Sequence, residues 1–365
     1  MDCRKLLQLK SDLLCYGLKI DPNAKDALLQ QNKYVWDHDF IHAAHFTLEG
    51  QNLNTCISER FCSASPYIIR AEAESFKLYK GEDVICPIEI VHAPQWCSMT
   101  VGDYEIGQFL RPHSPKCIVC WPILSCDYYL NGTECKFCSM GNYHNHAILP
   151  EHTVISMIKQ AVAYDPSYEI TLGGGIHNGR DETFTYFSSI CKALHDSGID
   201  NLSFELAPPD ELKNIDMLRE SGAKAIIMNL EIADSERRLA ICPEKGKIPV
   251  EHYFRAYDRA VHVFGRGNVS CVLLAGIQPR LDIIRMSALL IEHGVIPSIL
   301  PFKPVDGCQM RTQLTTDPKE LVSIALANQQ KLIRAGLAAS MQPGCTKCNA
   351  CSLETVAELT ATEGL

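Results

Sequence analysis

The chain has 365 residues, of which 46% are hydrophobic, and a formal net charge of −9. These values allow a large buried core and exclude the basic surface that a nucleic-acid-binding protein needs. No apolar run is as long as a membrane span, and residues 1–14 lack the apolar segment of a signal peptide. We therefore expect a cytoplasmic protein whose 18 cysteines are metal ligands, catalytic thiols or buried small side chains rather than disulfides.

The first part of the chain, residues 1–112, has a mixed helical and extended pattern. Residues 6–20 and 21–31 predict two helices, the first ending at Gly17. Short alternating runs between residues 65 and 106, interrupted by proline and glycine, are typical of strands. We interpret this part as a small α+β extension of the main domain, without chemistry of its own.

From residue 116 onward, six short apolar runs alternate with six helical segments. The expected strands cover residues 118–124, 169–175, 201–207, 223–231, 268–276 and 295–302. The expected helices cover residues 152–164, 182–198, 211–222, 250–265, 282–294 and 317–336. Such repeats indicate a parallel sheet with helices outside it. The pattern alone is compatible with a partial barrel, a full TIM barrel or a doubly wound sheet.

Three cysteines lie in one loop directly after the first expected strand. Cys126, Cys135 and Cys138 are spaced C-x8-C-x2-C, and Phe137 directly precedes the last of them. Three thiolates are one fewer than a closed structural zinc site requires. They suit an iron–sulfur cluster that keeps one iron free for a ligand other than protein.

This loop resembles the cluster loop of the radical S-adenosylmethionine (radical SAM) superfamily. The usual pattern there is C-x3-C-x2-C with an aromatic residue before the third cysteine, whereas the first gap in this chain is x8. The repeats and the order of the sites match over about residues 116–336. The resemblance implies a (β/α)6 partial TIM barrel over residues 113–338. It also implies a 4Fe–4S cluster on the three cysteines and S-adenosylmethionine (SAM) as a cofactor.

Further candidate residues stand at the carboxyl ends of the expected strands, where parallel α/β architectures bind ligands. Gly173, Gly174 and Gly175 end the second strand, and without side chains they leave the backbone open to a ligand. They resemble the superfamily's GGE motif, whose backbone holds the amino group of SAM, with Gly175 in place of the acid. A tight turn is the alternative interpretation of these glycines.

Acidic and basic residues follow the next two strands. Glu205 ends the third strand and Glu231 the fourth, with Arg237 and Arg238 shortly after it. A buried acid needs a cation or a hydrogen-bond donor. The stretch from Asn229 to Arg238 resembles one in lipoyl synthase and its relatives, where the acid and the arginine bind SAM. A surface salt bridge is the alternative. Gly276 ends the fifth strand and resembles the superfamily glycine that packs under the adenine.

A second group of cysteines lies in the tail, residues 339–365. Cys345, Cys348 and Cys351 form a C-x2-C-x2-C pattern in a polar stretch. Ferredoxin-type loops use this spacing, and the resemblance favours an auxiliary 4Fe–4S cluster over a four-cysteine zinc site. We expect Cys308, after the sixth strand, to be the fourth ligand.

Two further cysteines, Cys117 and Cys120, lie within the first strand. They stand three positions apart, so their side chains point to opposite faces. We expect both to be core residues, or one of them to line the barrel, rather than to share a metal. Side chains expected to face the substrate are Tyr128, Tyr143, His144, His146 and His177.

The resemblance leans toward the lipoyl and biotin synthase-like branch. It implies reductive cleavage of SAM to a 5′-deoxyadenosyl radical, hydrogen abstraction from a small-molecule or carrier-bound substrate, and an electron donor such as flavodoxin or ferredoxin. Sulfur insertion from the auxiliary cluster is the first choice. Rearrangement, oxidation or C–C bond chemistry with that cluster as electron acceptor is the alternative. A metal-binding scaffold, or a plain TIM-barrel lyase using Lys303, stays open. Neither nucleic acid nor membrane is an expected partner.

Overall fold

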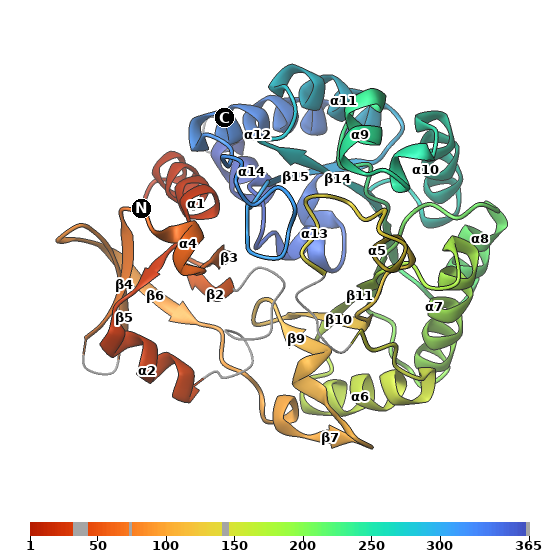
Figure 1. Ribbon diagram of the computed structural model, residues 1–365, viewed down its shortest axis with the longest axis horizontal. Helices are drawn as coiled ribbons and strands as arrows, with labels where there is room; N and C mark the ends of the chain where they lie inside the picture. Colours follow the sequence, from red (N-terminus) through yellow and green to blue (C-terminus); the bar gives the residue numbers. More distant parts are fainter. Residues whose placement is uncertain (32–42, 73–74, 141–145, 363–365) are drawn as a thin grey trace.

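The computed structural model describes residues 1–31, 43–72, 75–140 and 146–362. A curled half-barrel sheet with helices on its outer side forms the larger part, and an α+β part lies beside it (Figure 1). The predicted mixed α/β architecture is therefore confirmed. No helix in the described part of the chain is both long and apolar enough to cross a membrane.

The N-terminal part contains the two predicted helices, α1 (Cys3–Tyr16) and α2 (Pro22–Gln31). The Asp2 side chain accepts a hydrogen bond from the Lys5 amide at the start of α1, and Gly17 ends this helix with a φ of 72°. A six-stranded sheet has the order β1-β4-β5-β6-β2-β3. Its strands are β1 (Lys19–Ile20), β2 (Ala43–Leu48), β3 (Gln51–Cys56), β4 (Tyr67–Glu72), β5 (Ser75–Lys80) and β6 (Asp83–Ile90).

The half-barrel is a seven-stranded sheet of order β15-β14-β13-β12-β11-β10-β9. Its strands are β9 (Leu110–Pro112), β10 (Cys117–Ile123), β11 (Glu169–Gly174), β12 (Leu202–Glu205), β13 (Ala225–Ile227), β14 (Val269–Ala275) and β15 (Ile296–Pro301). Strands β10 to β15 pair in parallel and in chain order, as the strand–helix repeats predict. The edge strand β9, which was not predicted, pairs antiparallel with β10.

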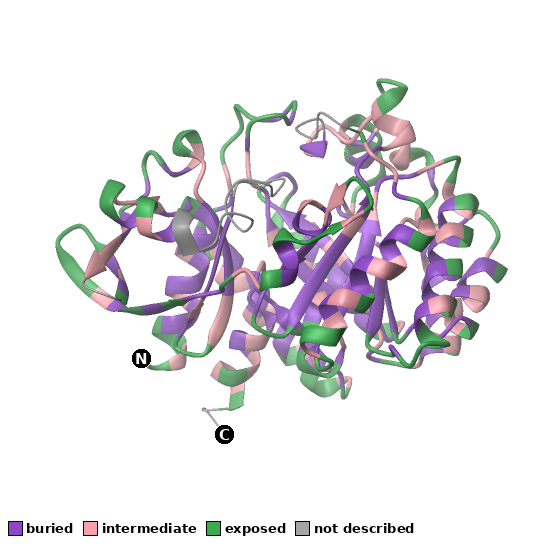
Figure 2. Ribbon diagram, turned by 90° about the horizontal axis from the view of Figure 1, so that it is seen from below, coloured by how far each residue is buried: buried purple, intermediate pink, exposed green. Residues whose placement is uncertain are grey.

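Six helices, all predicted, follow strands β10 to β15 in turn and cover the outside of the sheet (Figure 1). They are α6 (Glu151–Tyr164), α7 (Arg180–His195), α8 (Lys213–Glu220), α10 (Val250–Phe264), α11 (Arg280–Glu292) and α12 (Pro318–Arg334). Figure 2 shows the strands as buried and the outward helix faces as exposed, which is the pattern of a sheet covered by amphipathic helices.

Shorter elements complete the chain. They are α4 (Glu59–Cys62), η1 (Gln95–Ser98), β7 (Thr100–Val101), β8 (Tyr104–Glu105), η2 (Ile106–Gln108), α5 (Asp127–Leu130), α9 (Ser235–Ile241), η4 (Lys245–Lys247), η5 (Ala339–Met341), α13 (Cys345–Cys348) and α14 (Glu354–Thr362). Of these, η4 and α13 position residues of the two candidate sites described below.

The C-terminal tail enters the half-barrel, and α13 lies at its centre in Figure 1. The Cys345 amide donates to Thr171 Oγ1 on β11 at 3.0 Å, and the hydroxyls of Ser270 on β14 and Thr346 lie 2.9 Å apart. Thr171 and Ser270 stand near the amino ends of their strands, so the tail closes that end of the barrel. Helix α14 packs against α1 and α12, and all three segments contribute to one hydrophobic core.

Candidate functional site

A cavity of about 210 Å³ opens at the carboxyl ends of β10 to β13. Its wall includes several of the residues predicted from the sequence. They are Cys126, Cys135, Phe137, Cys138, Gly174, Gly175, Glu205 and Glu231, and the substrate candidate Tyr128 also lines it. The cavity therefore gathers the ends of four strands and the cysteine loop, as the parallel topology predicts.

Cys126, Cys135 and Cys138, here called the loop cysteines, all face this cavity. Cys126 follows the end of β10 after two residues and directly precedes α5. A turn links the Cys138 amide to the Cys135 carbonyl at 2.9 Å. Burial raises the pKa of Cys126 and raises that of Cys138 to about 12, and the neighbouring loop thiols add to both shifts. Three thiols that line one cavity and interact electrostatically fit an iron–sulfur cluster, whose irons would bind them as thiolates.

The Cys135 thiol has a further sulfur neighbour. It is hydrogen-bonded to the Cys242 thiol, which, with burial, raises the pKa of Cys135 well above its usual value. Cys242 is fully buried in a hydrophobic cluster with Cys308 and Phe302, and Cys135 packs against that cluster. The sequence analysis did not single out Cys242, because it stands alone after α9.

The glycines after β11 are required by a close approach of the cysteine loop. A Cβ at Gly175 would lie 1.7 Å from the Ser125 carbonyl oxygen and 2.7 Å from Cys126 Cβ. A Cβ at Gly174 would lie 2.8 Å from the Ile123 carbonyl oxygen. Gly173 is less restricted, since its nearest neighbours would be 3.1 Å away. Thus the packing of β10 on β11 itself requires the pair at 174 and 175, which also leaves backbone open to the cavity.

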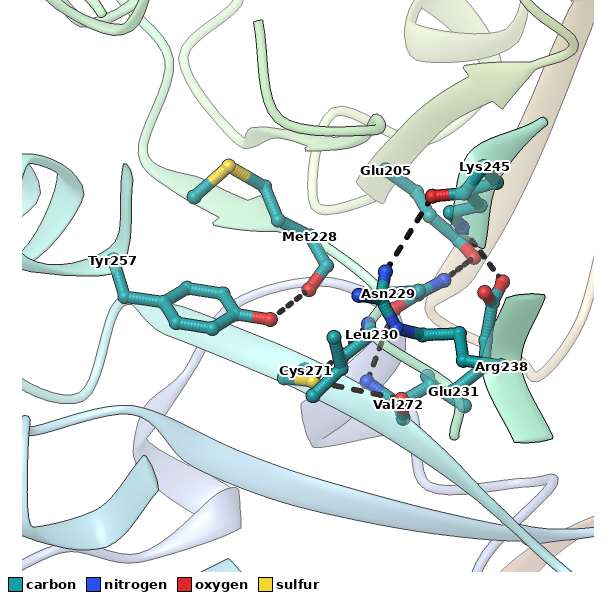
Figure 3. Close-up of polar contacts among 10 residues, drawn as sticks. All are labelled: Glu205, Met228, Asn229, Leu230, Glu231, Arg238, Lys245, Tyr257, Cys271 and Val272. Atoms are coloured by element: carbon teal, nitrogen blue, oxygen red, sulfur yellow. Dashed lines mark hydrogen bonds and ion pairs between the residues drawn. The ribbon is translucent and has the colours of Figure 1, made fainter. Parts of the chain in front are cut away.

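Glu231 and Lys245 form a buried ion pair at the cavity wall (Figure 3). Lys245 Nζ lies 2.8 Å from Glu231 Oε1, with only 13% and 11% of the two side chains exposed. Burial lowers the pKa of Lys245, but the charge and hydrogen bond of Glu231, together with nearby Tyr253 and Cys135, outweigh it and raise the pKa well above its usual value. Glu231 Oε2 is buried without a hydrogen-bond partner, and the residue has a φ of 64°, which is strained for a side chain of this kind.

Glu205 is the second acid of the cavity. Asn229 Nδ2 donates to its Oε1 at 2.6 Å, and Asn229 Oδ1 accepts from the Val272 amide at 3.0 Å (Figure 3). Burial raises the pKa of Glu205, and the hydrogen bond from Asn229 opposes this shift. Asn229 therefore fixes the carboxylate relative to β14, a role that was not predicted.

The two arginines lie apart from the described lining of the cavity. Arg238 is 2% exposed, donates to the Ile248 carbonyl at 2.7 Å and lies over the Tyr253 ring at 5.4 Å. Arg237 donates to the Ile277 carbonyl at 3.3 Å. The cation beside Glu231 is Lys245 instead. Sequence analysis missed it because it is 14 residues further along the chain, and the only signal was the lysine-rich turn.

Gly276 also lies outside the described cavity lining. It has a φ of 91°, and a Cβ there would lie 2.5 Å from Thr316 Oγ1, so glycine is needed for packing against that segment. Nearby Gln278, not predicted, donates to the carbonyl oxygens of Glu231 and Leu274, both at 2.7 Å. Gln278 thereby holds the backbone at Glu231 in place.

Of the expected substrate-facing residues, Tyr128 lines the cavity, and burial raises its pKa to about 12. His146 and His177 are not among the described lining residues, and the His146 ring lies 6.4 Å from that of Tyr129. Tyr143 and His144 fall outside the described residues.

The C-terminal cysteines gather at the other end of the barrel. Cys345, Cys348 and Cys351 influence one another electrostatically, and the thiols of Cys348 and Cys117 are hydrogen-bonded. Cys117 is buried as expected, but it faces the tail. The expected ligand Cys308 packs instead in the cluster that contacts the loop cysteine Cys135.

Among the described residues, no three His, Cys, Asp or Glu side chains are placed so that they could hold a single metal ion. A four-iron cluster is larger than one ion, and its ligands bind separate corners.

No protein-family model matches the chain. The bacteriochlorophyllide c C-7(1)-hydroxylase of Chlorobaculum limnaeum is 25% identical over 210 residues, which are 51% of this chain and 52% of the hydroxylase. The chain thus spans about half the length of this curated relative.

Among solved structures, methylornithine synthase (PylB) has a TM-score of 0.50 at 14% identity, covering 67% of this chain and 69% of its own. Coproporphyrinogen III oxidase (HemN) of Escherichia coli, a radical SAM enzyme, has a TM-score of 0.37 at 16% identity, covering 56% of this chain and 50% of the oxidase. At 14% identity the likeness to methylornithine synthase concerns the fold, a half-barrel of the same kind. None of these similarities singles out a lipoyl or biotin synthase-like branch.

Proposed function

We propose that this chain is a radical SAM enzyme whose 4Fe–4S cluster is held by the loop cysteines. The observation that carries the proposal is the convergence of three thiols, the Gly174–Gly175 backbone and the Glu231–Lys245 pair on one cavity. The six parallel strands in chain order support the (β/α)6 partial barrel of that superfamily, as do the hydroxylase similarity and the methylornithine synthase fold.

The residues of the cavity can be given roles toward SAM. The backbone at Gly174 and Gly175 would hold its amino group, and the unpartnered Oε2 of Glu231 is a buried acceptor for an ammonium or hydroxyl group. We assign the contact with the SAM carboxylate to Lys245 in place of Arg237 and Arg238, because its ammonium is the one in the wall.

Two further residues would bind or enclose SAM. Phe137 supplies apolar surface beside the last two loop cysteines, and Gly276 keeps its proposed place under the adenine. When bound, a reduced cluster would donate one electron to SAM, so that the C5′–S bond breaks to give methionine and a 5′-deoxyadenosyl radical able to take a hydrogen atom from the substrate. The chain's task is to orient that substrate and exclude water. The electron would come from a flavodoxin or ferredoxin in the cytoplasm.

For the reaction that follows, we propose a second cluster on the C-terminal cysteines and two candidate outcomes. Sulfur insertion is supported by the Asn229-Leu230-Glu231 stretch that resembles lipoyl synthase. Oxidation, in which the substrate radical loses one electron to the second cluster, is supported by the similarity to a hydroxylase.

The test is SAM cleavage after anaerobic reconstitution with iron and sulfide. We expect dithionite-dependent release of 5′-deoxyadenosine from the intact chain and none from Cys126→Ala. Cys62→Ala, which removes a cysteine of the N-terminal part, is the matched control and should cleave SAM like the intact chain. Release by the Cys126→Ala variant would refute the assignment of the loop cysteines.

A further inference from the structure

Four cysteines meet at the amino end of the half-barrel, and we call them the floor cysteines: Cys117, Cys345, Cys348 and Cys351. Cys117 on β10 is 3% exposed and shares a small hydrophobic cluster with Cys348, which is 8% exposed. Their thiols are hydrogen-bonded, and Cys345 lies close enough to Cys351 and Cys348 to interact with both electrostatically. One strand of the barrel and the tail thus bring four thiols together, with Cys117 and Cys348 buried and Cys345 and Cys351 half-buried.

The sulfur of Cys348 is surrounded by hydrogen-bond donors. Besides Cys117, the Ser114 hydroxyl and the Ala350 amide donate to it, and Asn52 Nδ2 lies 4.0 Å away. The ammonium of Lys10, 1% exposed, is held nearby by the Asn349 carbonyl at 2.6 Å. Donors aimed at a buried sulfur are the surroundings of an iron–sulfur ligand.

The backbone that carries the tail cysteines is fixed by its own contacts with the strands. The Gly344 amide donates to Glu169 Oε2 at 2.9 Å, and Lys347 Nζ pairs with Glu169 Oε1 at 2.6 Å. A Cβ at Gly344 would lie 2.1 Å from Ser203 Oγ, so only glycine allows this close approach. Asn349, with a φ of 53°, turns the chain between Cys348 and Cys351. The thiols are therefore positioned by the protein before any cofactor binds.

The floor cysteines also border the interior of the barrel. Cys351 lines a cavity of about 160 Å³ together with Phe137 and Ser139 of the cysteine loop and Lys303 after β15. Glu205, an acid of the main cavity, lies close enough to Cys345 to interact with it electrostatically. The space between the loop cysteines and the floor cysteines thus has one site at each end, and a substrate held there would meet both.

We infer that Cys117, Cys345, Cys348 and Cys351 together ligate a second four-iron cluster, with Cys117 rather than Cys308 as the fourth ligand. Four protein thiolates leave no iron corner open, in contrast to the loop cysteines. Such a cluster can accept one electron from a substrate radical in the cavity beside Cys351 but cannot bind SAM. The electron-accepting role rests on the proposed function. The set of four ligands does not, because these residues lie outside the SAM site and can be tested separately.

The experiment uses the full chain with all three loop cysteines changed to alanine, reconstituted anaerobically with iron and sulfide. We expect roughly four irons and four sulfides per chain, as one 4Fe–4S cluster requires, and an EPR signal after reduction. Adding Cys117→Ala should remove most of the iron or convert the signal to that of a three-iron species. Adding Cys308→Ala, or Cys120→Ala on the same strand, should change neither iron content nor signal.

Full iron and an unchanged signal with Cys117→Ala would overturn the inference, as would loss of iron with Cys308→Ala or tetrahedral zinc in place of iron. Thermal melting of each variant, followed by circular dichroism before iron is added, separates misfolding from the loss of a cluster ligand. Cys117→Ser keeps the size of the side chain and should alter the EPR signal if Cys117 is a ligand. SAM cleavage by the intact chain is measured in parallel. If the loop-cysteine variant loads iron but the intact chain does not cleave SAM, the proposed function fails and the floor site stands.

Discussion

The buried pair Glu231–Lys245 allows a test of the cavity that depends on electrostatics alone. Its two charges lie 2.8 Å apart with little solvent contact. Removing one partner leaves the other charge buried and uncompensated, which typically costs about 3–5 kcal/mol. We therefore expect Glu231→Gln and Lys245→Met each to lower the free energy of unfolding by about that amount.

The double variant, Glu231→Gln with Lys245→Met, should lose less than the sum of the two single changes, because neither charge is then left alone. For residues in direct contact the difference is on the order of 1–3 kcal/mol. Urea-induced unfolding followed by circular dichroism measures the stability of the unchanged chain, both single variants and the double variant, which together form a double-mutant cycle. The exposed pair Lys192–Asp196 is the matched control, and Lys192→Met should change stability by less than about 1 kcal/mol.

Catalysis adds a second readout to the same variants. If the pair contacts SAM, the double variant should lose less stability than the sum of the single changes yet release no 5′-deoxyadenosine. Additive losses in the cycle would refute the ion pair, and SAM cleavage at the original rate by the double variant would refute its role in binding.

Three further predictions follow from the site. Gly175→Ala must displace the Ser125 carbonyl, because the new Cβ would lie 1.7 Å from its oxygen, and it should reduce iron loading and SAM cleavage at least tenfold. The control Gly173→Ala should reduce both far less. Near-normal iron loading of Gly175→Ala would contradict this packing. Because the pKa of Lys245 is raised in the fold, its contribution to stability is present below its unfolded value of 10.5 and is lost as pH rises through the higher folded value; Lys245→Met should lack that alkaline loss in urea titrations. Cys242→Ala should keep iron loading and SAM cleavage. Loss of iron in this variant would mean that Cys242 is a fourth ligand, which would leave no iron free for SAM.

Much of the half-barrel could be predicted because its signals are local. Apolar runs that alternate with helical segments indicate a parallel sheet, and reading the residues after each run led to Cys126, Gly175 and Glu231, all of which line the cavity. Strands β2 and β3 gave no such signal, because they bury His45, Asn54 and Thr55 where an apolar pattern is expected.

The missed residues depend on contacts between distant parts of the chain. Lys245 meets Glu231 only because the turn at η4 folds back over the cavity, and the buried Arg238 holds the Lys245 carbonyl at 3.4 Å. Cys117 contacts Cys348 because the tail enters the barrel at the amino ends of the strands. Strand alternation correctly separated Cys117 from Cys120, but it could not show what the buried face of Cys117 would contact.

The central claim is that the loop cysteines leave one iron corner open and that SAM occupies it. The most direct measurement is the EPR spectrum of the reduced, anaerobically reconstituted chain with and without SAM. The account predicts that SAM changes the signal of one cluster, and that this change disappears in Cys138→Ala. A spectrum that SAM leaves unaltered, or a protein that holds zinc at the loop cysteines, would contradict it.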